Sequence, residues 1–468
     1  MPDDQDNDGH FTSSTTNNAE DGEMSMSDMD NMMRSMYPRG FQLSNFTLEK
    51  GWYLNASNAI CTFRGRPCNW TTDFNHVFTA FGNCFTFNAN NDAFQDQPGA
   101  KNGLSLEINI EQQYYSNRLQ LGDQVDAGIF FHVHNQSVPP SVETDGRAVP
   151  PGFHAYVGLT RTDSYSIDPP YGLCNKSAEL VNFPDYSVAA CVLECKEQHM
   201  LRECGCELFE YEGRGRECSL MEVTTCAKPL LGEIKTIYYF LWNHLYEFSN
   251  MCDCPVACED VTYATSVTYT SIPSNSTASE LATNLRMSPT EVKANYVIMD
   301  IYLENLNYIK SEQLPAVEPS ALISDIGGQF GLFMGFSLLT IIEFIEFAAM
   351  TLYTWILSAK RQPKVDIVMV KMTSTRNEKE EKAKEEPQVS IEAFATSTSA
   401  HGFARAYQSR HLVAKAIWTA LITAGFVVAV VQIYFRFASY FRYDTTTKIT
   451  MVFAKELQFP AVTICNAN

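Results

Sequence analysis

The stretch that decides the fold is DIGGQFGLFMGFSLLTIIEFIEFAAMTLYTWIL, residues 325 to 357, a long apolar run. As a helix, residues 326 to 357 would measure about 48 Å, whereas the hydrocarbon core of a bilayer is about 30 Å thick. The excess length predicts either a tilted helix or a break near Gly335, Phe336 and Ser337. The stretch is therefore a predicted membrane span.

Two carboxylates, Glu343 and Glu346, lie well inside this span. Ionisable groups at that depth are expensive and normally face a partner or a water-filled path. Gly327, Gly331 and Gly335 recur at every fourth position, and such a stripe lets neighbouring helices approach closely. Copies of the helix around an axis would place carboxylate rings below a glycine-lined constriction, and such rings attract cations. The alternative is a single-pass anchor whose glutamates lie near the cytosolic interface.

A second apolar span covers residues 412–437 and has basic residues at both ends. The linker between the spans, 358–411, has basic residues directly after the first span, and it has no cysteine and no N-x-S/T site. Because basic residues beside membrane ends mark the cytosolic side, we expect this linker in the cytosol. Residues 41–320 and 438–468 are then expected outside the cell. Residues 1–40 are acidic with little apolar periodicity, and we expect them to be disordered or loosely packed.

Glycosylation signals and cysteines support the extracellular assignment. Six sequons precede the first span: Asn45, Asn55, Asn69, Asn135, Asn175 and Asn275. All 14 cysteines lie outside the linker, and an even number with close spacings in a glycosylated region indicates a disulfide framework. The alternative is a zinc site at Cys204, Cys206, Cys252, Cys254 and Cys258. It is disfavoured because zinc prefers C-x2-C spacing and a reducing compartment.

Composition and patterning favour a mixed extracellular domain without enzymatic chemistry. The net charge of -20, from 54 acidic and 34 basic residues, repels nucleic-acid phosphates, so no nucleic-acid partner is expected. Apolar alternation and β-branched residues predict strands at 104–110, 129–135, 261–270 and 296–303, and helical periodicity appears at 187–204 and 232–249. The fold class is thus an α+β membrane protein with two transmembrane helices and a large disulfide-rich extracellular domain, in which peripheral helices surround a β core.

No catalytic constellation is present: the sequence has no G-x-S-x-G, no H-E-x-x-H and no phosphate-binding glycine loop, so we expect no enzyme and no cofactor. His132 and His134 share one face of a predicted strand and could bind a metal. The simpler alternative, a partly exposed histidine pair without metal, is preferred.

Ten segments across the chain carry a joint resemblance to one family. They are GNCFTFN (82–88), GLSLEINIEQQYY (103–115), AGIFFHVHNQSVPP (127–140), PPYGLC (169–174), YSVAACVLEC (186–195), CDCPVAC (252–258), LNYIKSEQ (306–313), DIGGQFGLF (325–333), SAHGFAR (399–405) and FPAVTICN (459–466). With these motifs the chain resembles the degenerin/epithelial sodium channel superfamily, which includes acid-sensing and peptide-gated channels. The resemblance implies a homo- or heterotrimer in the plasma membrane, in which each subunit contributes two helices and a hand-like extracellular domain, and through which sodium ions pass.

The resemblance also implies roles for individual residues. Gly335, Phe336 and Ser337 match a Gly-x-Ser selectivity filter, with Phe336 bulkier than the small residue often found there. Glu343 and Glu346 match the acidic positions below that filter. The remaining matches are Ser324 before the pore helix, His401 and Gly402 as the cytosolic His-Gly gating motif, Gly331 at the level of amiloride-type blockers, and Tyr171 with Tyr443 as the aromatic pair that couples the first helix to the thumb.

The resemblance further implies a disulfide pairing for every cysteine. The pairs are Cys61 with Cys68, Cys84 with Cys465, Cys174 with Cys258, Cys191 with Cys254, Cys195 with Cys252, Cys204 with Cys226, and Cys206 with Cys218.

The stimulus is an unknown extracellular ligand, for which a peptide is favoured and protons remain an alternative. The family's acid sensors often carry histidines just after the first helix, whereas this chain has Tyr443, Asp444 and Thr445 there. Regulation by proteolysis is disfavoured because the finger region has no R-x-x-R site and the linker has no P-P-x-Y motif. A non-conducting two-span surface receptor would also explain the spans, sequons and cysteines, although not the filter-like turn with its two glutamates.

The order of the segments departs from the family. The family's first helix and FPAVTICN motif precede its extracellular domain, whereas here they follow it, so the printed order is circularly rotated. Translocating the residues ahead of the first span normally requires a signal peptide, and the first residues lack a basic start and an apolar core. We expect either a rotated or mis-joined record, in which case the product could be a fragment without function, or a permuted protein whose linker joins the old termini, with a finger segment shortened or lost.

Overall fold

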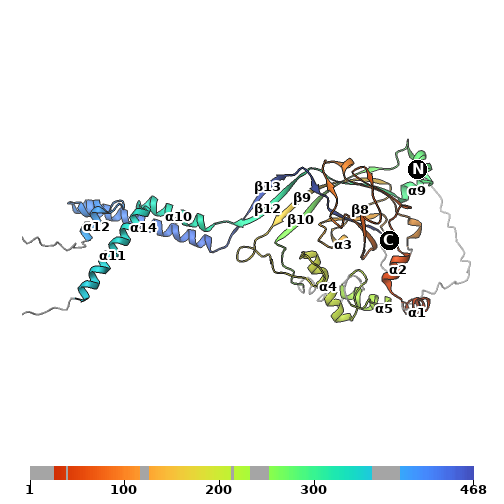
Figure 1. Ribbon diagram of the computed structural model, residues 1–468, viewed down its shortest axis with the longest axis horizontal. Coiled ribbons are helices and arrows are strands. Elements are labelled where there is room, and N and C mark those ends of the chain that lie inside the picture. Colours follow the sequence, from red (N-terminus) through yellow and green to blue (C-terminus); the bar gives the residue numbers. More distant parts are fainter. Residues whose placement is uncertain are drawn as a thin grey trace, which may run out of the picture. The chain divides into compact units, whose positions relative to one another are not determined.

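The computed structural model describes residues 26–37, 41–115, 126–211, 215–231, 252–360 and 391–467 (Figure 1). The chain forms two compact units, each described here by itself. The first unit comprises residues 1–166, 173–312 and 449–468, and the second comprises residues 167–172 and 313–448.

The first unit is built on β-sheets. The largest has eight strands in the order β13-β12-β9-β11-β6-β1-β2, with β10 paired to β9. Their bounds are β1 Ala59–Phe63, β2 Arg66–Pro67, β6 Leu104–Asn109, β9 Phe153–Tyr165, β10 Glu259–Ser271, β11 Tyr296–Leu303, β12 Asn307–Pro315 and β13 Thr445–Phe453. The four strands predicted from alternation are confirmed as β6, β10 and β11 in this sheet and as β7 (Ile129–His134) in the next.

A five-stranded sheet in the order β3-β4-β15-β7-β8 and the pair β14-β5 complete the β structure described for this unit. The bounds are β3 Phe74–Thr79, β4 Gly82–Phe87, β5 Phe94–Gln95, β7 Ile129–His134, β8 Arg147–Val149, β14 Leu457–Gln458 and β15 Ala461–Asn466. Strand β15 comes from the far end of the sequence and yet lies between β4 and β7, so every one of its residues is buried. Cys465 of β15 lies opposite Cys84 of β4 and is bonded to it.

Strand alternation explains where the core lies. In β6, Leu104, Leu106 and Ile108 are fully buried while the residues between them are half-buried. Because successive side chains of a strand point to opposite faces, this pattern places one face of β6 in the core. The same alternation in β11 buries Met299 and Ile301 beside them.

Helix α4 (Val188–Cys204) lies outside the sheets and matches the helix predicted at 187–204. It begins at Ser187, whose side chain accepts a hydrogen bond from the Ala190 N–H group, and it ends at Gly205 in the left-handed conformation. The structure has seven disulfides and no free cysteine, so the zinc alternative is wrong. The pairs are those implied by the resemblance: 61–68, 84–465, 174–258, 191–254, 195–252, 204–226 and 206–218.

The remaining short helices of this unit are α1 Met26–Met36, α2 Leu43–Lys50, α3 Val142–Asp145, α5 Leu220–Glu222, α6 Lys228–Leu231, α8 Ala278–Leu285 and α9 Pro289–Asn295. Within the segment 1–40, expected to be disordered or loosely packed, residues 26–36 form α1, where Asp30 and Arg34, one turn apart, form an ion pair of 2.8 Å. The rest of that segment, except Tyr37, lies outside the described residues. The helix predicted at 232–249 also lies outside them.

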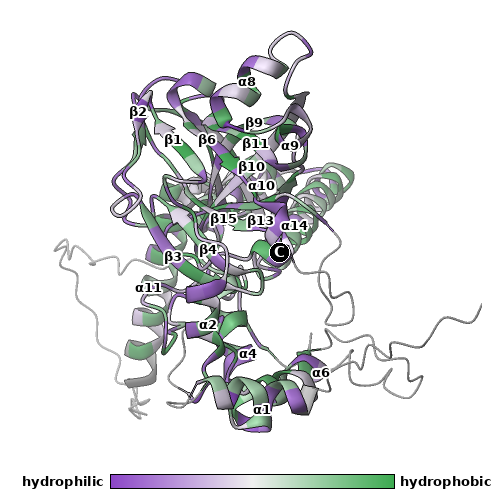
Figure 2. Ribbon diagram, turned by 90° about the vertical axis from the view of Figure 1, so that its right-hand side faces the viewer, coloured by the Kyte–Doolittle hydropathy of each residue, from purple (hydrophilic) through white to green (hydrophobic). Residues whose placement is uncertain are grey.

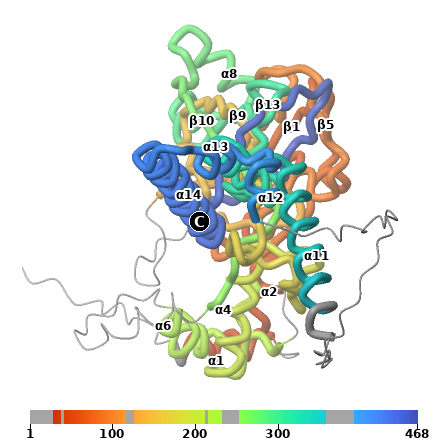
Figure 3. The backbone as a smooth tube through the Cα atoms, turned by 90° about the vertical axis from the view of Figure 1, so that its left-hand side faces the viewer, coloured from red at the N-terminus to blue at the C-terminus, as the bar shows by residue number. Residues whose placement is uncertain are grey.

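The second unit is helical and contains α10 Pro319–Met334, α11 Leu338–Lys360, α12 Ile391–Ser397, α13 Phe403–Gln408 and α14 Leu412–Tyr440. Among the residues that the structure describes, two segments are long and apolar enough to cross a membrane: Leu338–Ile356 and Leu412–Tyr440. Figure 2 shows the hydrophobic colouring of α11 and α14. Within this unit, α13 lies beside α14, and α12 lies beside α11 (Figure 3), where Phe394 stacks on Phe347 at 4.3 Å between ring centroids.

Candidate pore segment and its contacts

The apolar stretch of residues 325–357 is broken between α10 and α11. Helix α10 ends at Gly335, which has φ of +65° and donates its N–H to the Gly331 carbonyl oxygen at 3.0 Å. Glycine adopts this left-handed conformation without a side-chain penalty, which explains why the helix ends there. Of the two alternatives predicted for the excess length, the structure has the break.

Ser337 restarts the helix. Its hydroxyl accepts a hydrogen bond from the Thr340 N–H group at 3.3 Å, and its carbonyl oxygen accepts the N–H of Ile341 at 3.2 Å. A serine at this position satisfies an N–H group that the first turn of a helix leaves without a partner. Phe336 lies between the two helices, with its ring stacked on Phe330 at 6.0 Å. The three residues predicted as a filter thus form a non-helical link between two helix ends.

A segment from the predicted linker, residues 398–402, returns to this break. The Ser399 N–H group and the Thr398 hydroxyl donate to one carboxylate oxygen of Glu343, at 2.9 and 3.0 Å. The hydroxyls of Ser399 and the fully buried Thr340 are hydrogen-bonded at 2.6 Å. Glu343 therefore has a partner within its own chain.

His401 lies against the break itself. The backbone N–H group of His401 donates to the Met334 carbonyl oxygen at 3.2 Å. This oxygen is one of the acceptors that the end of α10 leaves without a partner inside the helix. A Cβ atom at Gly335 would lie 1.5 Å from the His401 ring, so the ring occupies the space that a side chain at 335 would need. Gly402 follows in the left-handed conformation, with φ of +86°, and α13 begins after it. The His-Gly pair thus turns the chain directly beside the predicted filter.

The other predicted positions of the pore helices are less constrained within one chain. Glu346 is exposed and makes no side-chain hydrogen bond or ion pair in the described part of the chain. A Cβ at Gly327 would meet no atom within 4 Å. Ser324, on α10, is exposed and donates to the Ser320 carbonyl oxygen. The close helix approach lies instead at Gly425 of α14, where a Cβ would lie 3.1 Å from the Phe333 carbonyl oxygen of α10.

The second unit also contains the predicted aromatic pair. The rings of Tyr171 and Tyr443 meet edge to face, with 5.2 Å between their centroids and an angle of 89° between their planes. Edge-to-face pairs of this kind contribute about 0.5–1.5 kcal/mol beyond their buried area. Close by, the Ala316 N–H group donates to the Asp444 carbonyl oxygen at 2.8 Å. The ends of α14 and of the chain leading into α10 are therefore held together.

In the first unit, His132 and His134 are stacked with 5.0 Å between ring centroids. The expectation of a partly exposed pair is wrong for His134, which is buried. Its Nδ1 lies 2.9 Å from the Asn135 carbonyl oxygen, and its Nε2 lies 2.8 Å from the Thr463 hydroxyl. Burial lowers the pKa of His134 from 6.5 to about 4, with the neighbouring His132 as the second cause. Among the described residues no group of three potential ligands surrounds the pair.

The six sequon asparagines all lie on the described surface of the first unit, none of them buried: Asn45, Asn55, Asn69, Asn135, Asn175 and Asn275. At three of them the side-chain oxygen accepts the N–H of the Ser or Thr two residues later, at 2.7 Å for Ser57, 3.0 Å for Thr71 and 2.9 Å for Ser177. These turns place the asparagines in exposed loops, as a glycan acceptor requires.

Sequence reasoning missed the contact between residues 398–402 and the break. The only signal for it was the place of His401 and Gly402 shortly before a span, which the resemblance alone made meaningful. The polar residues that form the contact, Thr340, Thr398 and Ser399, carry no motif of their own.

Taken together, these features define a two-span membrane protein with a disulfide-rich β domain and a polar break within one span. The family model described as "Amiloride-sensitive sodium channel" matches residues 2–347 and 394–468. The chain belongs to this family of ion channels.

Curated relatives agree with this assignment. The bile acid-sensitive ion channel of Homo sapiens is 38% identical over 328 residues, covering 68% of this chain and 62% of the relative. Acid-sensing ion channel 1 of Gallus gallus is 32% identical over 323 residues, covering 67% and 59%. Acid-sensing ion channel 2 of Rattus norvegicus is 32% identical over 317 residues, covering 66% and 60%. The chain thus matches about three fifths of the length of each.

Proposed function

We propose that the chain is a subunit of a trimeric, sodium-selective, amiloride-sensitive cation channel opened by an extracellular ligand. The observation that carries this proposal is the polar break at Gly335 to Ser337, followed within α11 by Glu343 and Glu346. In a trimer, three such breaks would form a constriction, and the exposed carboxylate of Glu346 would line the path below it. Carboxylates in such a ring favour cations over anions.

Under this proposal the trimer has two arrangements, one closed and one open, and gating is the change from one to the other. Movement of the extracellular domain would pass through the contact of Tyr171 with Tyr443 to α14 and α10. The segment 398–402 would then keep or release its hydrogen bonds to Glu343. Because this segment holds the break from one side, its position would decide whether the constriction is open.

The ligand is the least constrained part of the proposal. A peptide is favoured, and protons remain an alternative because two of the relatives are named acid-sensing channels. A bile acid is a third candidate ligand, and only the name of the human relative supports it. A proton sensor would need groups that titrate near neutral pH, whereas the buried His134 has a pKa of about 4. A non-conducting surface receptor is the second candidate function, favoured by the disulfide framework.

Voltage-clamp recording of cells that express the chain tests the proposal. We expect a current that amiloride blocks and whose reversal potential follows the sodium gradient. Glu346→Gln is expected to lower cation conductance without changing the amount of protein at the surface, and Glu259→Gln, an exposed acidic residue on β10, is the matched control. Surface protein with no current under peptide, acid or bile acid would favour the receptor instead.

A further inference from the structure

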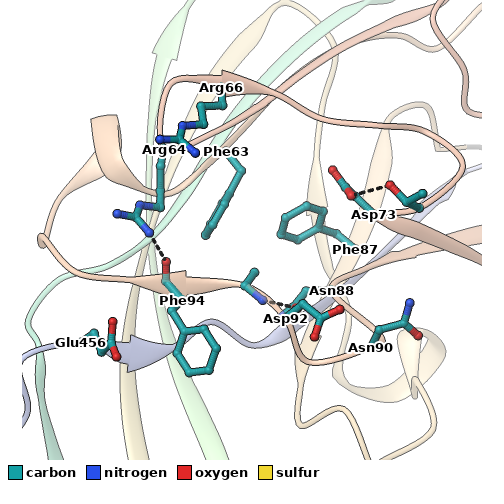
Figure 4. A pocket seen from close by; sticks show the side chains of 12 residues that line it. Phe63, Arg64, Arg66, Asp73, Phe87, Asn88, Asn90, Asp92, Phe94 and Glu456 are labelled. Atoms are coloured by element: carbon teal, nitrogen blue, oxygen red, sulfur yellow. Dashed lines mark hydrogen bonds between the residues drawn. The ribbon is translucent and has the colours of Figure 1, made fainter.

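A cavity of about 490 Å³ opens in the first unit where strand ends from all three sheets meet. Its size lies in the range of about 300–1,000 Å³ that is usual for small-ligand sites. Figure 4 shows the side chains that surround it. The β1–β2 hairpin contributes Phe63, Arg64 and Arg66, the loop from β4 to β5 contributes Asp92, and β5 contributes Phe94. Glu456, between β13 and β14, completes the same rim.

The walls of this hairpin pocket are held in place before any ligand arrives. The Cys61–Cys68 disulfide closes the hairpin. Arg64 donates to the Phe94 carbonyl oxygen at 3.2 Å and pairs with Asp96, so it ties the hairpin to β5. Asn88 accepts the Ala93 N–H at 2.9 Å and thereby fixes the loop that carries Asp92. Preorganised walls lower the entropy cost of binding.

The floor of the pocket is aromatic. Phe63 and Phe87 contact each other with 5.4 Å between ring centroids. Phe94, the first residue of β5, is 40% exposed. Asp92 and Glu456 line the same pocket and bring two carboxylates to it. Aromatic rings and carboxylates that line one pocket both attract an organic cation.

The charges that remain unused inside the pocket have one predominant sign. Arg64 is neutralised by Asp96, and Asp73 accepts hydrogen bonds from the Asn69 N–H and the Thr72 hydroxyl. Within the described part of the chain, Asp92, Glu456 and Arg66 make no hydrogen bond or ion pair through their side chains. Two carboxylates and one guanidinium without a partner among the described residues thus line a pocket that also contains aromatic rings.

We propose that the hairpin pocket binds a small amphipathic organic cation, an amine or guanidinium attached to an apolar body. The cationic group would lie between Asp92 and Glu456 over the ring of Phe94. The apolar body would cover Phe63 and Phe87, and Arg66 would accept a polar or anionic far end. A short peptide with a free amino group has this chemistry. The binding itself does not depend on the proposed function. Only the further step, in which an occupied pocket opens the channel, rests on it.

Calorimetric titration of the purified full chain in detergent tests the site without any current. The probes are phenethylamine, its neutral isostere 2-phenylethanol, and the anion 3-phenylpropionate. We expect saturable binding of phenethylamine, with the alcohol bound about tenfold more weakly because it lacks the charge. Asp92→Asn and Glu456→Gln should each weaken the amine by about tenfold, and Glu259→Gln should leave its affinity unchanged.

Arg66→Gln provides a gain of binding that misfolding cannot mimic. Removing the guanidinium should tighten phenethylamine binding by about threefold, because the cationic probe loses a repulsive charge. It should weaken any binding of 3-phenylpropionate, because the anionic probe loses an attractive charge. The proposal is overturned if phenethylamine does not saturate the unaltered chain, if it binds no better than the alcohol, or if the two carboxylate variants bind it like Glu259→Gln. A current recorded without amine binding would leave the channel assignment intact and reject only the pocket.

Discussion

Gly335 meets two constraints at once, since its backbone is left-handed and the His401 ring fills the space beside its Cα. Alanine would cost about 1–2 kcal/mol from the backbone alone, before its methyl group displaces the ring. We expect Gly335→Ala to lower the current about tenfold or more at equal surface expression, and to change the preference for sodium over potassium. Gly328→Ala is the matched control, because a Cβ there meets nothing within 4 Å. Unchanged ion preference in Gly335→Ala would remove the filter assignment.

His134 carries a pH dependence of stability in the first unit. Its pKa is about 4 in the folded chain, compared with about 6.5 unfolded, so the unfolded chain binds the extra proton between these values. Stability therefore rises with pH across this window, and up to about 3 kcal/mol is lost as the pH falls from 6.5 to 4. The loss should appear as a lower midpoint of urea unfolding in the full chain.

The variant His134→Gln isolates this contribution, because glutamine does not titrate and can still contact Thr463. The difference in unfolding free energy between the two chains should shrink as the pH falls from 6.5 to 4. His132 stacks on the His134 ring, and burial lowers the pKa of His132 too. The variant His132→Gln should therefore change the pH dependence of the unfolding free energy in the same direction, by a smaller amount. A difference that is independent of pH would contradict the assignment to His134.

Among the elements, the segment 398–402 is the one on which the proposed gating depends. The hydroxyl oxygens of Thr340 and Ser399 are 2.6 Å apart, which brings their Cβ atoms near the distance that a disulfide needs. We expect the double variant Thr340→Cys with Ser399→Cys to form a disulfide under mild oxidation and thereby hold the segment on the break. The current should then become insensitive to ligand and recover after reduction.

The background for this experiment is low because all native cysteines are already in disulfides. Thr340→Cys with Ser397→Cys is the control, since the Ser397 hydroxyl bonds within its own helix α12 and not to α11. Thiol labelling reports the bond independently of current. If the first pair keeps both thiols reactive while the channel still gates, the segment does not rest on the break as the structure has it.

Local patterns predicted most elements but not their contacts. Strands such as β6 and helix α4 carry their period in a few neighbouring residues, so they could be predicted from the sequence. The length of the span predicted either a tilt or a break near Gly335, and only the structure decides for the break. The partner of Glu343 could not be predicted, because Thr398 and Ser399 have no periodicity and lie 55 and 56 residues away. Helix α1 was missed because its polar, methionine-rich composition resembles that of a disordered segment.

For the whole molecule, the order of the segments along the chain is separate from the way in which they pack. Residues 449–468 supply the central strand β15 to the first unit, and α14 packs on α10 within the second. Both units therefore need the segment that follows α13. The motifs predict that this order is rotated relative to the family's. The resemblance nevertheless implied every disulfide that the structure has, because those pairings belong to the fold and not to the order.

A re-ordered chain tests this view directly. Placing residues 391–468 ahead of residues 26–360 keeps every described contact, and it also puts a membrane span before the large domain, which avoids the need to export that domain first. We expect the same seven disulfides by mass spectrometry under non-reducing conditions, with more protein at the cell surface than from the printed order. Deletion of residues 459–468 from either chain should abolish both the correct disulfides and the surface protein. The deletion removes β15 from between β4 and β7 and leaves the backbone groups of these two strands unpaired. A re-ordered chain with scrambled disulfides, beside a printed order that forms them correctly, would mean that the rotation is part of how this protein folds.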